Sequence, residues 1–391
     1  MDIARFEGSP LGHLVPISGF DPRFNEEYSH FAYVADPLPN EVALSGDTWS
    51  VVADAMLSLG RLDDATSRFP NPHLLVRPAV RREAVSTSAL EGTFTDLEDV
   101  LAADVDESAA LTPEVREVVN AVTATEIGVE AIRSGRPISV QLACELQEVL
   151  IRGTRTEGDD TGRVRTGNVF IGREDQRVIE TRFIPCPAGP RLEIGFRQWE
   201  RWVNADNSIH LLVKTALAHY QFETLHPFHD GNGRLGRILA ILQLIAGGAI
   251  HYPNLALSAW LEEHGTEYRD GLAAVSATGD FDPWVRLLAR AVAEQAERER
   301  TRVDHLLTLR EELVNRTRQA GLRGLAIQIT EDLIGFPLAR VRDLSERYGV
   351  TFEAANRAVA RLVEQGVLQQ IGDRSYGRIF AAREVVNILR D

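Results

Sequence analysis

The sequence has few cysteines and no long apolar run, and each absence excludes a class of protein. Cys144 and Cys186 are its only cysteines, and neither has a neighbour at metal-ligand spacing. A disulfide framework or a zinc site is therefore not expected. No apolar run approaches the roughly 20 residues that cross a membrane, and no signal peptide is visible. We therefore expect a cytoplasmic protein without a membrane partner.

An excess of positive charge is also missing. The formal net charge of −15 argues against a protein that coats nucleic acid without sequence preference. The apolar share is ordinary for a globular protein. Because 391 residues exceed the length of one typical domain, two or three domains are expected.

One short segment, residues 225–237 (LHPFHDGNGRLGR), gathers polar residue types that are used in catalysis and in phosphate binding. The residues that follow, 238–249 (ILAILQLIAGGA), are apolar on nearly all sides, as expected of a helix in the middle of a domain. The pattern predicts a polar loop that enters the N-terminus of a buried helix.

The residue types in this loop suit phosphate binding and proton transfer. Gly231 and Gly233 allow a left-handed turn close to a ligand, and a glycine-rich loop before a helix presents free N–H groups to phosphate. Arg234 and Arg237 are three residues apart, so they share a helix face that can clamp phosphate oxygens. The ordinary pKa of a histidine lies near neutrality, which makes His226 a natural general base.

Asp230 adds a hard oxygen ligand of the kind that binds Mg²⁺ on a polyphosphate. Each feature alone has a simpler interpretation. A Gly-Asn-Gly run is usually a turn, and a histidine beside an apolar run is usually a hydrogen-bonded core residue. The ordered combination of a base, an acid, glycines and arginines favours a nucleotide site.

Residues 226–237 match every fixed position of the signature HxFx(D/E)GNGRxxR, and the chain therefore resembles the Fic (filamentation induced by cAMP) family. The resemblance implies an enzyme that transfers AMP from ATP to a Tyr, Thr or Ser hydroxyl of a target protein, or of itself. It also implies that His226 takes the proton of the attacking hydroxyl and that Asp230 holds Mg²⁺.

The same resemblance assigns the ATP-binding residues. These are Gly231, Asn232, Gly233, Arg234, Leu235, Gly236 and Arg237, with the glycine run at the α- and β-phosphates and Arg237 at the γ-phosphate. Arg234 would be shared between phosphate contact and loop support, and Phe228 would anchor the loop in the core. Tyr268 lies where the family usually carries an aromatic residue against the adenine, and a plain packing role is the alternative.

A second segment, residues 81–93 (RREAVSTSALEGT), predicts by itself only a short helix that ends at Gly92, with Glu91 as an exposed acid. Beside the signature, residues 87–92 resemble the family's inhibitory motif, (S/T)xxxE(G/N). The resemblance implies the subclass with an N-terminal inhibitory helix, in which Glu91 pairs with Arg237. A carboxylate there would occupy the donors that the γ-phosphate needs and would repel polyphosphate.

Residues 162–190 interrupt the helical pattern. Two β-prone runs, Val169–Ile171 and Val178–Ile184, flank a polar turn near Arg173–Gln176 and predict a β-hairpin. An exposed hairpin without a role is one interpretation. The resemblance implies instead the family's flap (about residues 168–185), which pairs with the backbone of the target protein by strand addition.

The remaining sequence predicts mostly helices. Residues 1–45, rich in proline, glycine and aromatic residues, predict an extended arm over a helical body. Asp47 is the expected N-cap of a helix that ends at Gly60, and Thr112–Pro113 is a good helix start. Further helices are expected over residues 139–151, 208–225 and 255–277, and from Trp284 through the charged run 293–313.

The last unit, residues 336–386, predicts two helices (Leu338–Tyr348, Phe352–Gln365) and a β-prone pair (Val367–Ile371, Tyr376–Phe380) around the turn Gly372–Ser375. This pattern is typical of a helix-turn-helix with a wing, and it resembles a winged helix. Arg357 and Arg361 would contact DNA in one interpretation. Because arginines barely outnumber acids here and lysine is absent, a protein-interaction module or weak DNA contact is favoured.

The sequence and its resemblance together predict a mostly α protein, with a Fic-type helical core, a β-hairpin flap and a small C-terminal winged helix-turn-helix domain. The expected divisions are residues 1–110 (arm and inhibitory helix region), 111–295 (catalytic core), 296–320 (helical linker) and 321–391 (winged helix). The leading function is a Mg²⁺-dependent protein adenylyltransferase restrained by Glu91, and a homodimer is a reasonable expectation. The alternatives are a nucleotide-sensing DNA-binding regulator, or a Fic-type enzyme that removes AMP or transfers another phosphate-containing group.

Overall fold

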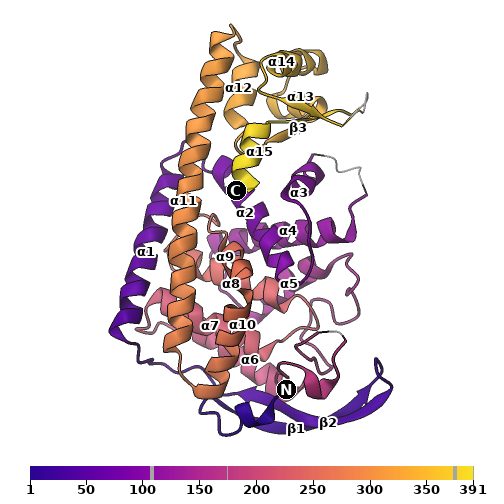
Figure 1. Cartoon of the computed structure of the whole chain (residues 1–391), viewed down its shortest axis with the longest axis vertical. Coiled ribbons are helices and arrows are strands. Elements are labelled where there is room, and N and C mark those ends of the chain that lie inside the picture. Colours follow the sequence, from indigo (N-terminus) through magenta and orange to yellow (C-terminus); the bar gives the residue numbers. More distant parts are fainter. Residues whose placement is uncertain (106–109, 174, 373–376, 391) are drawn as a thin grey trace.

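An N-terminal β-hairpin lies against one end of a helical body in the computed structural model of the chain (Figure 1), which describes residues 1–105, 110–173, 175–372 and 377–390. Strands β1 (Gly12–Asp21) and β2 (Glu26–Ala35) are antiparallel and paired along their whole length. Val15 and Ile17 are buried and alternate with exposed neighbours, so one face of the hairpin packs on the body. The expected extended arm is therefore a regular two-stranded sheet.

The body itself is helical. It consists of α1 (Gly46–Ser67), α2 (His73–Ala89), α3 (Leu97–Ala103), α4 (Pro113–Arg133), α5 (Val140–Ile151), α6 (Pro190–Asn204), α7 (Leu211–Leu225), α8 (Asn232–Ala246), α9 (Leu257–Glu263), α10 (Gly265–Thr278) and α11 (Asp282–Gln319), with the 3₁₀ turns η1 (Ile3–Arg5) and η2 (Val178–Glu180). The helical pattern expected over residues 255–277 is split into α9 and α10, which meet at His264. Within the described residues, none of the helices combines the length and the hydrophobicity of a membrane span.

Helices α7 and α8 form the centre of the core. Every residue of α8 from Asn232 to Leu244 is buried, and α7 is buried along most of its length. The prediction of a buried helix directly after residue 237 is thereby confirmed. The turn that joins them is partly buried: Pro227 and Phe228 lie inside the body, and His229 is exposed.

Helices α1 and α11 lie side by side along one edge of the molecule (Figure 1). Near the start of α11, the buried Trp284 indole donates a hydrogen bond to the Ala216 carbonyl of α7 at 2.8 Å, which ties α11 to the core. The helix then continues without a break to Gln319. The expected linker, residues 296–320, is thus the second half of one long helix.

A small C-terminal unit sits at the far end of α11 (Figure 1). It contains α12 (Leu325–Asp332), β3 (Leu338–Arg340), α13 (Val341–Tyr348), α14 (Phe352–Glu364), β4 (Gln369–Ile371), β5 (Ile379–Ala381) and α15 (Arg383–Arg390). The three strands form an antiparallel sheet in the order β3-β5-β4. Strand β3 lies within the first residues of an expected helix. Asp373–Ser375 of the expected turn, and Glu174 in the turn expected near residues 173–176, lie outside the described residues.

The C-terminal unit packs against the segment that contains α2 and α3. Arg383 of α15 forms an ion pair with Glu98 of α3 at 2.7 Å. Before β3, the Phe336 ring lies between two guanidinium groups, 4.6 Å from that of Arg77 on α2 and 3.5 Å from that of Arg347 on α13. Cation–π contacts of this kind stabilise a packed interface.

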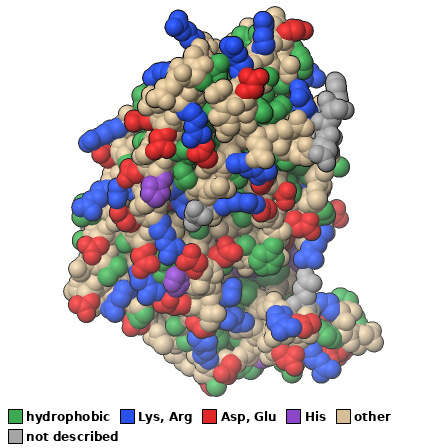
Figure 2. All heavy atoms as spheres, turned by 45° about the horizontal axis from the view of Figure 1, so that its top comes forward, with side chains coloured by type: hydrophobic (Ala, Val, Ile, Leu, Met, Phe, Trp, Pro, Cys, Tyr) green, Lys and Arg blue, Asp and Glu red, His purple; other side chains and the backbone are tan. Residues whose placement is uncertain are grey.

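Charges of both signs are interleaved on the face that Figure 2 shows, without one large patch of a single sign. Many of the arginines are in ion pairs, such as Arg290 with Glu267 at 2.7 Å and Arg298 with Glu263 at 2.9 Å. Exposed pairs of this kind contribute little to stability individually.

Both boundaries expected for the first helix are wrong. The N-cap of α1 is Ser45, whose hydroxyl accepts a hydrogen bond from the Thr48 N–H at 3.2 Å, and Asp47 lies in the first turn. The helix also continues through Gly60, which faces solvent. Leu62, beyond that glycine, is fully buried in the contact with α11. Packing of the apolar face therefore outweighs the local preference of glycine for a helix end.

The contact between the C-terminal unit and α2 predicts a destabilising substitution. A Cβ atom at Gly335 would lie 2.7 Å from the Cα atom and 2.9 Å from the carbonyl oxygen of Leu74. Backbone atoms of α2 cannot move aside as a side chain can, so Gly335→Ala is expected to lower the free energy of unfolding by about 1–3 kcal/mol. Urea denaturation followed by circular dichroism measures the change.

Gly60→Ala is the matched control for this experiment. A Cβ atom at Gly60 would meet nothing within 4 Å. Because glycine in an exposed helix interior costs about 1 kcal/mol relative to alanine, this substitution is expected to stabilise the protein. A stable Gly335→Ala variant, or a destabilised Gly60→Ala variant, would contradict the packing described above.

Candidate active site

The chain reverses direction sharply between α7 and α8. His226 caps the C-terminus of α7 in the left-handed conformation, with φ 48° and ψ 61°, which is uncommon for a residue with a side chain. Its N–H donates to the Phe222 carbonyl at 3.0 Å. Gly231, the N-cap of α8, is also left-handed, with φ 79°. Four residues between these two positions make the turn.

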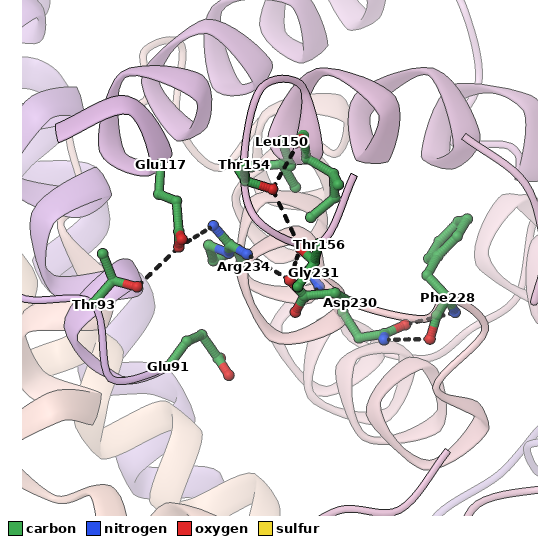
Figure 3. Close-up of polar contacts among 12 residues, drawn as sticks. Glu91, Thr93, Glu117, Leu150, Thr154, Thr156, Phe228, Asp230, Gly231 and Arg234 are labelled. Atoms are coloured by element: carbon green, nitrogen blue, oxygen red, sulfur yellow. Dashed lines mark hydrogen bonds and ion pairs between the residues drawn. The ribbon is translucent and has the colours of Figure 1, made fainter. Parts of the chain in front are cut away.

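The Asn232 side chain holds the turn together from inside. Its amide oxygen accepts a hydrogen bond from the Phe228 N–H, and its amide nitrogen donates to the Phe228 carbonyl, each at 2.9 Å (Figure 3). The Phe228 ring is fully buried and meets the Phe196 ring edge-on at 5.9 Å. Phe228 therefore lies in the core, as its expected anchoring role requires.

The start of α8 offers backbone donors to a ligand. The Leu235 N–H is bonded to the Gly231 carbonyl at 2.9 Å. The N–H groups of residues 232–234 precede it and have no partner within the helix, because a helix leaves its first donors free. A Cβ atom at Gly233 would lie 2.0 Å from Glu91 Oε1. Only glycine leaves room for an acidic group at this point, where the helix dipole favours negative charge.

The two arginines of the segment have different partners. Arg234 donates to Glu117 of α4 at 3.0 Å and to Asp230 at 3.4 Å (Figure 3). Glu117 also accepts a hydrogen bond from the Thr93 hydroxyl at 2.9 Å. Arg234 thus joins α8 to α4, and through Glu117 to the segment that follows α2.

Arg237 is held by the end of α2 and is only 2% exposed. Its Nε donates to the Thr87 hydroxyl at 2.7 Å, and another guanidinium nitrogen donates to the Thr87 carbonyl at 3.0 Å and to the Glu91 carboxylate at 2.6 Å. Burial opposes the charged form, but Glu91, Tyr268 and Glu223 together hold the pKa of Arg237 above its ordinary value. The structure therefore contains the expected pairing of Glu91 with Arg237.

The His226 ring is neutral and has one free nitrogen. Its Nδ1 lies 3.2 Å from the Glu223 carbonyl oxygen, which can only accept, so Nδ1 carries the hydrogen and Nε2 keeps its lone pair. Burial, followed by the charge of Arg165, lowers the pKa of His226 to about 4. The imidazole is therefore unprotonated at physiological pH, which is the form that accepts a proton.

A cavity lies between the end of α2, the turn after α7, and α10. It is lined by Leu90, Glu91, Ile171, Arg182, Phe183, Glu223, Thr224, His226, Gly233, Arg237, Tyr268, Arg269, Leu272, Ala273 and Ser276. The structure thus brings the expected base, the inhibitory acid, the second arginine and the second glycine to one space. Ile171 and Phe183, together with Leu272 and Ala273 of α10, add apolar surface that suits a planar ring, beside polar residues such as Arg182 and Arg269.

Some residues expected to bind nucleotide are used for packing. Leu235 is fully buried in the core, and Gly236 packs against Glu223, so neither lines the cavity. Tyr268 does line it, but its ring stacks on His219 at 5.9 Å and its hydroxyl lies 2.7 Å from the Nε2 atom of His219. Its position is therefore fixed by the core.

Asp230 is an ionised acid beside the helix start. One carboxylate oxygen accepts from the Gly231 N–H at 2.6 Å, and the other accepts from the Thr156 hydroxyl at 2.6 Å (Figure 3). Burial raises its pKa, but the charge of Arg234 and these hydrogen bonds keep the pKa below its ordinary value.

Among the described residues, no three His, Cys, Asp or Glu side chains gather as a metal site. One carboxylate fits Mg²⁺, which commonly takes one or two from the protein and its other ligands from water and phosphates.

The expected flap contains almost no strand. Ile171 and Phe183 form a single antiparallel bridge, with N···O distances of 2.9 and 3.1 Å, and part of the second predicted strand is the 3₁₀ turn η2. The prediction of a two-stranded hairpin at this position is therefore wrong. The Ile184 carbonyl, which points away from this bridge, instead accepts a hydrogen bond from the N–H of Tyr33 on β2 at 2.8 Å, so the segment is also bonded to the N-terminal sheet.

Sequence reasoning missed three polar residues that support the site. They are Glu117, which pairs with Arg234, Thr156, which donates to Asp230, and Arg165, which donates to the His226 carbonyl at 2.8 Å. All three lie outside the recognised motifs. Nothing in their local sequence distinguishes them from neighbouring acids, threonines and arginines, so packing alone reveals them.

Fold and site together define a class of protein. A helix start with free N–H groups, two buried arginines, one ionised carboxylate and a neutral histidine meet in a predominantly helical body. Such a set binds a phosphate-bearing ligand beside a proton acceptor.

Comparison with known proteins finds two family models that match parts of this chain. Residues 49–130 match the Fic/DOC family N-terminal domain, and residues 137–244 match the Fic/DOC family domain. The chain therefore contains segments that match both domains of this family. Over 131 residues it is 38% identical to the protein adenylyltransferase Fic of Culex quinquefasciatus and 36% identical to that of Aedes aegypti. These matches cover 33% of this chain and 23% of each relative.

Two solved structures share the fold. A Fic family protein from Desulfovibrio desulfuricans G20 matches 88% of this chain and 98% of its own, with a TM-score of 0.57 and 23% identity. Fic-1 from C. elegans (residues 134–508) matches 67% of this chain and 74% of its own, with a TM-score of 0.51 and 21% identity. At sequence identities this low, the two matches show a shared fold alone.

The internal support of the turn leads to a prediction. Asn232→Ala would leave the Phe228 N–H and carbonyl unpaired in a buried place. Since each unpaired buried group costs roughly 1–3 kcal/mol, the variant should lose about 2 kcal/mol or more of unfolding free energy in urea denaturation. Asn207→Ala is the control, because the Asn207 amide has no hydrogen-bond partner within the described structure. Equal losses in the two variants would contradict the supporting role of Asn232.

Proposed function

We propose that this protein is a protein adenylyltransferase, which transfers AMP from ATP to a hydroxyl side chain of a target protein or of itself. The observation that carries the proposal is the neutral His226 ring, with its free Nε2, on the cavity that Gly233 and Arg237 also line. A phosphate held by the start of α8 would lie next to a proton acceptor. The activity named for the curated relatives agrees with this chemistry.

The reaction is a displacement at the α-phosphorus. The hydroxyl oxygen of the target attacks that phosphorus, the bond to the oxygen that bridges to the β-phosphate breaks, and pyrophosphate leaves. The hydroxyl proton passes to Nε2 of His226, and AMP remains on the target as a phosphodiester. The low pKa keeps His226 ready to accept the proton, and a bound polyphosphate would raise that pKa because negative charge favours the protonated ring.

Other groups of the chain stabilise the transferred phosphate. The free N–H groups of residues 232–234 and the positive end of the α8 dipole face the charge that develops on the phosphate oxygens. Asp230 would hold Mg²⁺ with the help of bound phosphates, and Thr156 and Arg234 orient the Asp230 carboxylate. Bound Mg²⁺ would neutralise part of the polyphosphate charge.

The pairing of Glu91 with Arg237 supports autoinhibition. The Arg237 guanidinium donates three hydrogen bonds to the end of α2, two to Thr87 and one to the Glu91 carboxylate at 2.6 Å. A γ-phosphate would need the donors that Glu91 occupies. The Glu91 side chain is 40% exposed, so it can leave without opening the core.

Residues 168–185 are the proposed docking edge for the target protein. Ile171 and Phe183 line the cavity that contains His226, so an extended target segment that lies along this edge would present its hydroxyl near the base. Arg182 of the same segment forms an ion pair with Asp270 on α10, beside the cavity.

Residues 321–391 are proposed to form a winged helix-turn-helix domain. The arrangement of α13, the three-residue connection 349–351, α14 and the sheet β3-β5-β4 supports this assignment. We propose protein contact as its role, since acids and arginines are mixed throughout the unit. A gel shift that retains specific DNA fragments would favour the DNA-binding alternative.

Labelling with ATP that carries radioactive α-phosphate tests the proposed activity. With Mg²⁺ present, Glu91→Gly should label protein at least about tenfold faster than the unmodified chain, because loss of one charge-assisted contact near Arg237 removes about 1.4 kcal/mol or more of inhibition. His226→Ala in the Glu91→Gly background should remove the label while ATP still binds.

Glu91→Gln is the matched variant, because it keeps the size of the side chain and removes its charge. It should release only part of the inhibition, since the amide oxygen can still accept from Arg237. Label that persists without His226 would refute the proposed base, and unchanged labelling in Glu91→Gly would remove Glu91 from the inhibitory role.

Metal removal gives a separate prediction. In the Glu91→Gly variant, an excess of EDTA over Mg²⁺ should reduce labelling to background, and restored Mg²⁺ should recover it, because one carboxylate cannot offset the polyphosphate charge. Asp230→Asn should raise the Mg²⁺ concentration needed for half-maximal labelling. Full labelling in EDTA would contradict a metal role for Asp230.

A further inference from the structure

Arg165 is a buried guanidinium without an acid. Its exposure is 2%, and no carboxylate of the described residues lies within ion-pair distance of it. By contrast, the two arginines of the phosphate loop each have a carboxylate partner. Burial lowers the pKa of Arg165 to about 10, which still leaves it charged at physiological pH. A buried charge of this kind must be compensated by hydrogen bonds.

Backbone carbonyls from two separate segments provide that compensation. On one side, Arg165 donates to the carbonyls of Gly167 at 3.0 Å and Cys186 at 2.5 Å, which flank the docking edge. On the other side, it donates to the carbonyls of His226 at 2.8 Å and Leu225 at 3.4 Å, at the end of α7. One planar group therefore spans both ends of the docking segment and the residue that carries the base.

The contacts with the turn fix a strained residue. Among the described residues, only Asn25 and His226 have a positive φ without being glycine. The carbonyl of His226 accepts from the Arg165 side chain, and the carbonyl of Pro227 accepts from the Arg165 N–H at 3.0 Å. The two peptide groups that follow the base are thus both bonded to one residue. Left-handed backbone persists where the surroundings determine it in this way.

We infer that Arg165 is the positioning residue that sets the imidazole of His226 at a fixed place relative to the target-docking segment. The inference rests on the proposed function. The target hydroxyl is presented by residues 168–185, whereas the proton acceptor belongs to the end of α7. Transfer requires the hydroxyl oxygen and Nε2 of His226 to be placed to within a fraction of an ångström. Arg165 is hydrogen-bonded to the carbonyls that flank the docking segment and to the carbonyl of His226.

The side-chain type follows from this task. A guanidinium offers five N–H donors in a rigid plane and can reach carbonyls on opposite sides at once, whereas a lysine ammonium is a single point of charge on a flexible stem. Glutamine would keep some length but would lose the charge and most of the donors. A lysine at this position should therefore retain only part of the positioning role of Arg165.

The test compares Arg165→Gln and Arg165→Lys in the Glu91→Gly background. Arg163→Gln is the matched control, because Arg163 is exposed and lies two residues away. We measure self-labelling from α-phosphate-labelled ATP over a range of ATP concentrations, together with ATP affinity. Arg165 does not line the cavity, so Arg165→Gln should keep the dissociation constant for ATP within about threefold. Its maximal rate should fall on the order of 100-fold, since small misplacements of reacting groups cost this much.

Hydrogen exchange gives a readout that does not depend on activity. Arg165→Gln should speed amide exchange in residues 167–172 and 226–231 together, while Arg163→Gln should leave both segments unchanged. Arg165→Lys should give intermediate rates in both experiments. If Arg165→Gln does not fold, the Arg165→Lys variant decides by the same criteria.

The outcomes separate the inference from the proposed function. Unchanged maximal labelling in Arg165→Gln, or a parallel loss of rate and ATP affinity, would overturn the positioning role while the adenylyltransferase assignment stands. If the Glu91→Gly reference itself transfers no AMP, the proposed function fails, and the paired change in hydrogen exchange still tests whether Arg165 joins the two segments. If amide hydrogen exchange rises in only one of the segments 167–172 and 226–231, the proposed link between them through Arg165 is refuted.

Discussion

The turn between α7 and α8 must satisfy its backbone polar groups inside the protein, and much of the site follows from this constraint. Pro227 and Phe228 are buried within the turn, so their backbone groups need partners from the protein, whereas His229 is exposed. Asn232 forms hydrogen bonds with both backbone groups of Phe228. Arg165 donates to the carbonyls of His226 and Pro227, the two residues before Phe228. The donors at the start of α8 remain for a ligand. A rigid turn with a few free N–H groups is what a phosphate site requires.

Three buried arginines around this turn are stabilised in three different ways. Arg234 is paired with Glu117 on a neighbouring helix, and Arg165 is surrounded by carbonyls. Arg237 has a carboxylate partner, Glu91, that is 40% exposed and lies just after the end of α2. An exposed partner at a helix end is easier to exchange for phosphate than a buried one. This difference supports the proposal that Arg234 is structural and that Glu91 regulates access to Arg237.

The position of α2 also depends on distant parts of the chain. Its first turns meet Phe336, and the segment beyond Glu91 continues to Glu98, which pairs with Arg383. The helix that ends just before Glu91 is therefore packed against the C-terminal unit as well as the core. The orientation of α2 therefore depends on contacts with both the core and the C-terminal unit.

Local signals in the sequence were sufficient where one residue decides an element boundary. The starts of α4 at Thr112–Pro113 and of α5 after Ser139 are confirmed, because each hydroxyl caps its own helix. Local signals failed where packing competes. The first helix passes through Gly60 because the next turn is buried, and the expected flap strands are reduced to one bridge, in a segment that is also hydrogen-bonded to β2.

The sequence by itself determined the chemistry of the loop: a histidine, an acid, glycines and arginines in a fixed order before an apolar helix. It also placed Glu91 in a recognisable motif, since spacing along one helix is a local property. Only the tertiary structure decided that Leu235 and Gly236 serve packing, and that Glu117, Thr156 and Arg165 support the site. These partners come from segments far apart along the chain. Their contacts exist only once the core has closed around the turn.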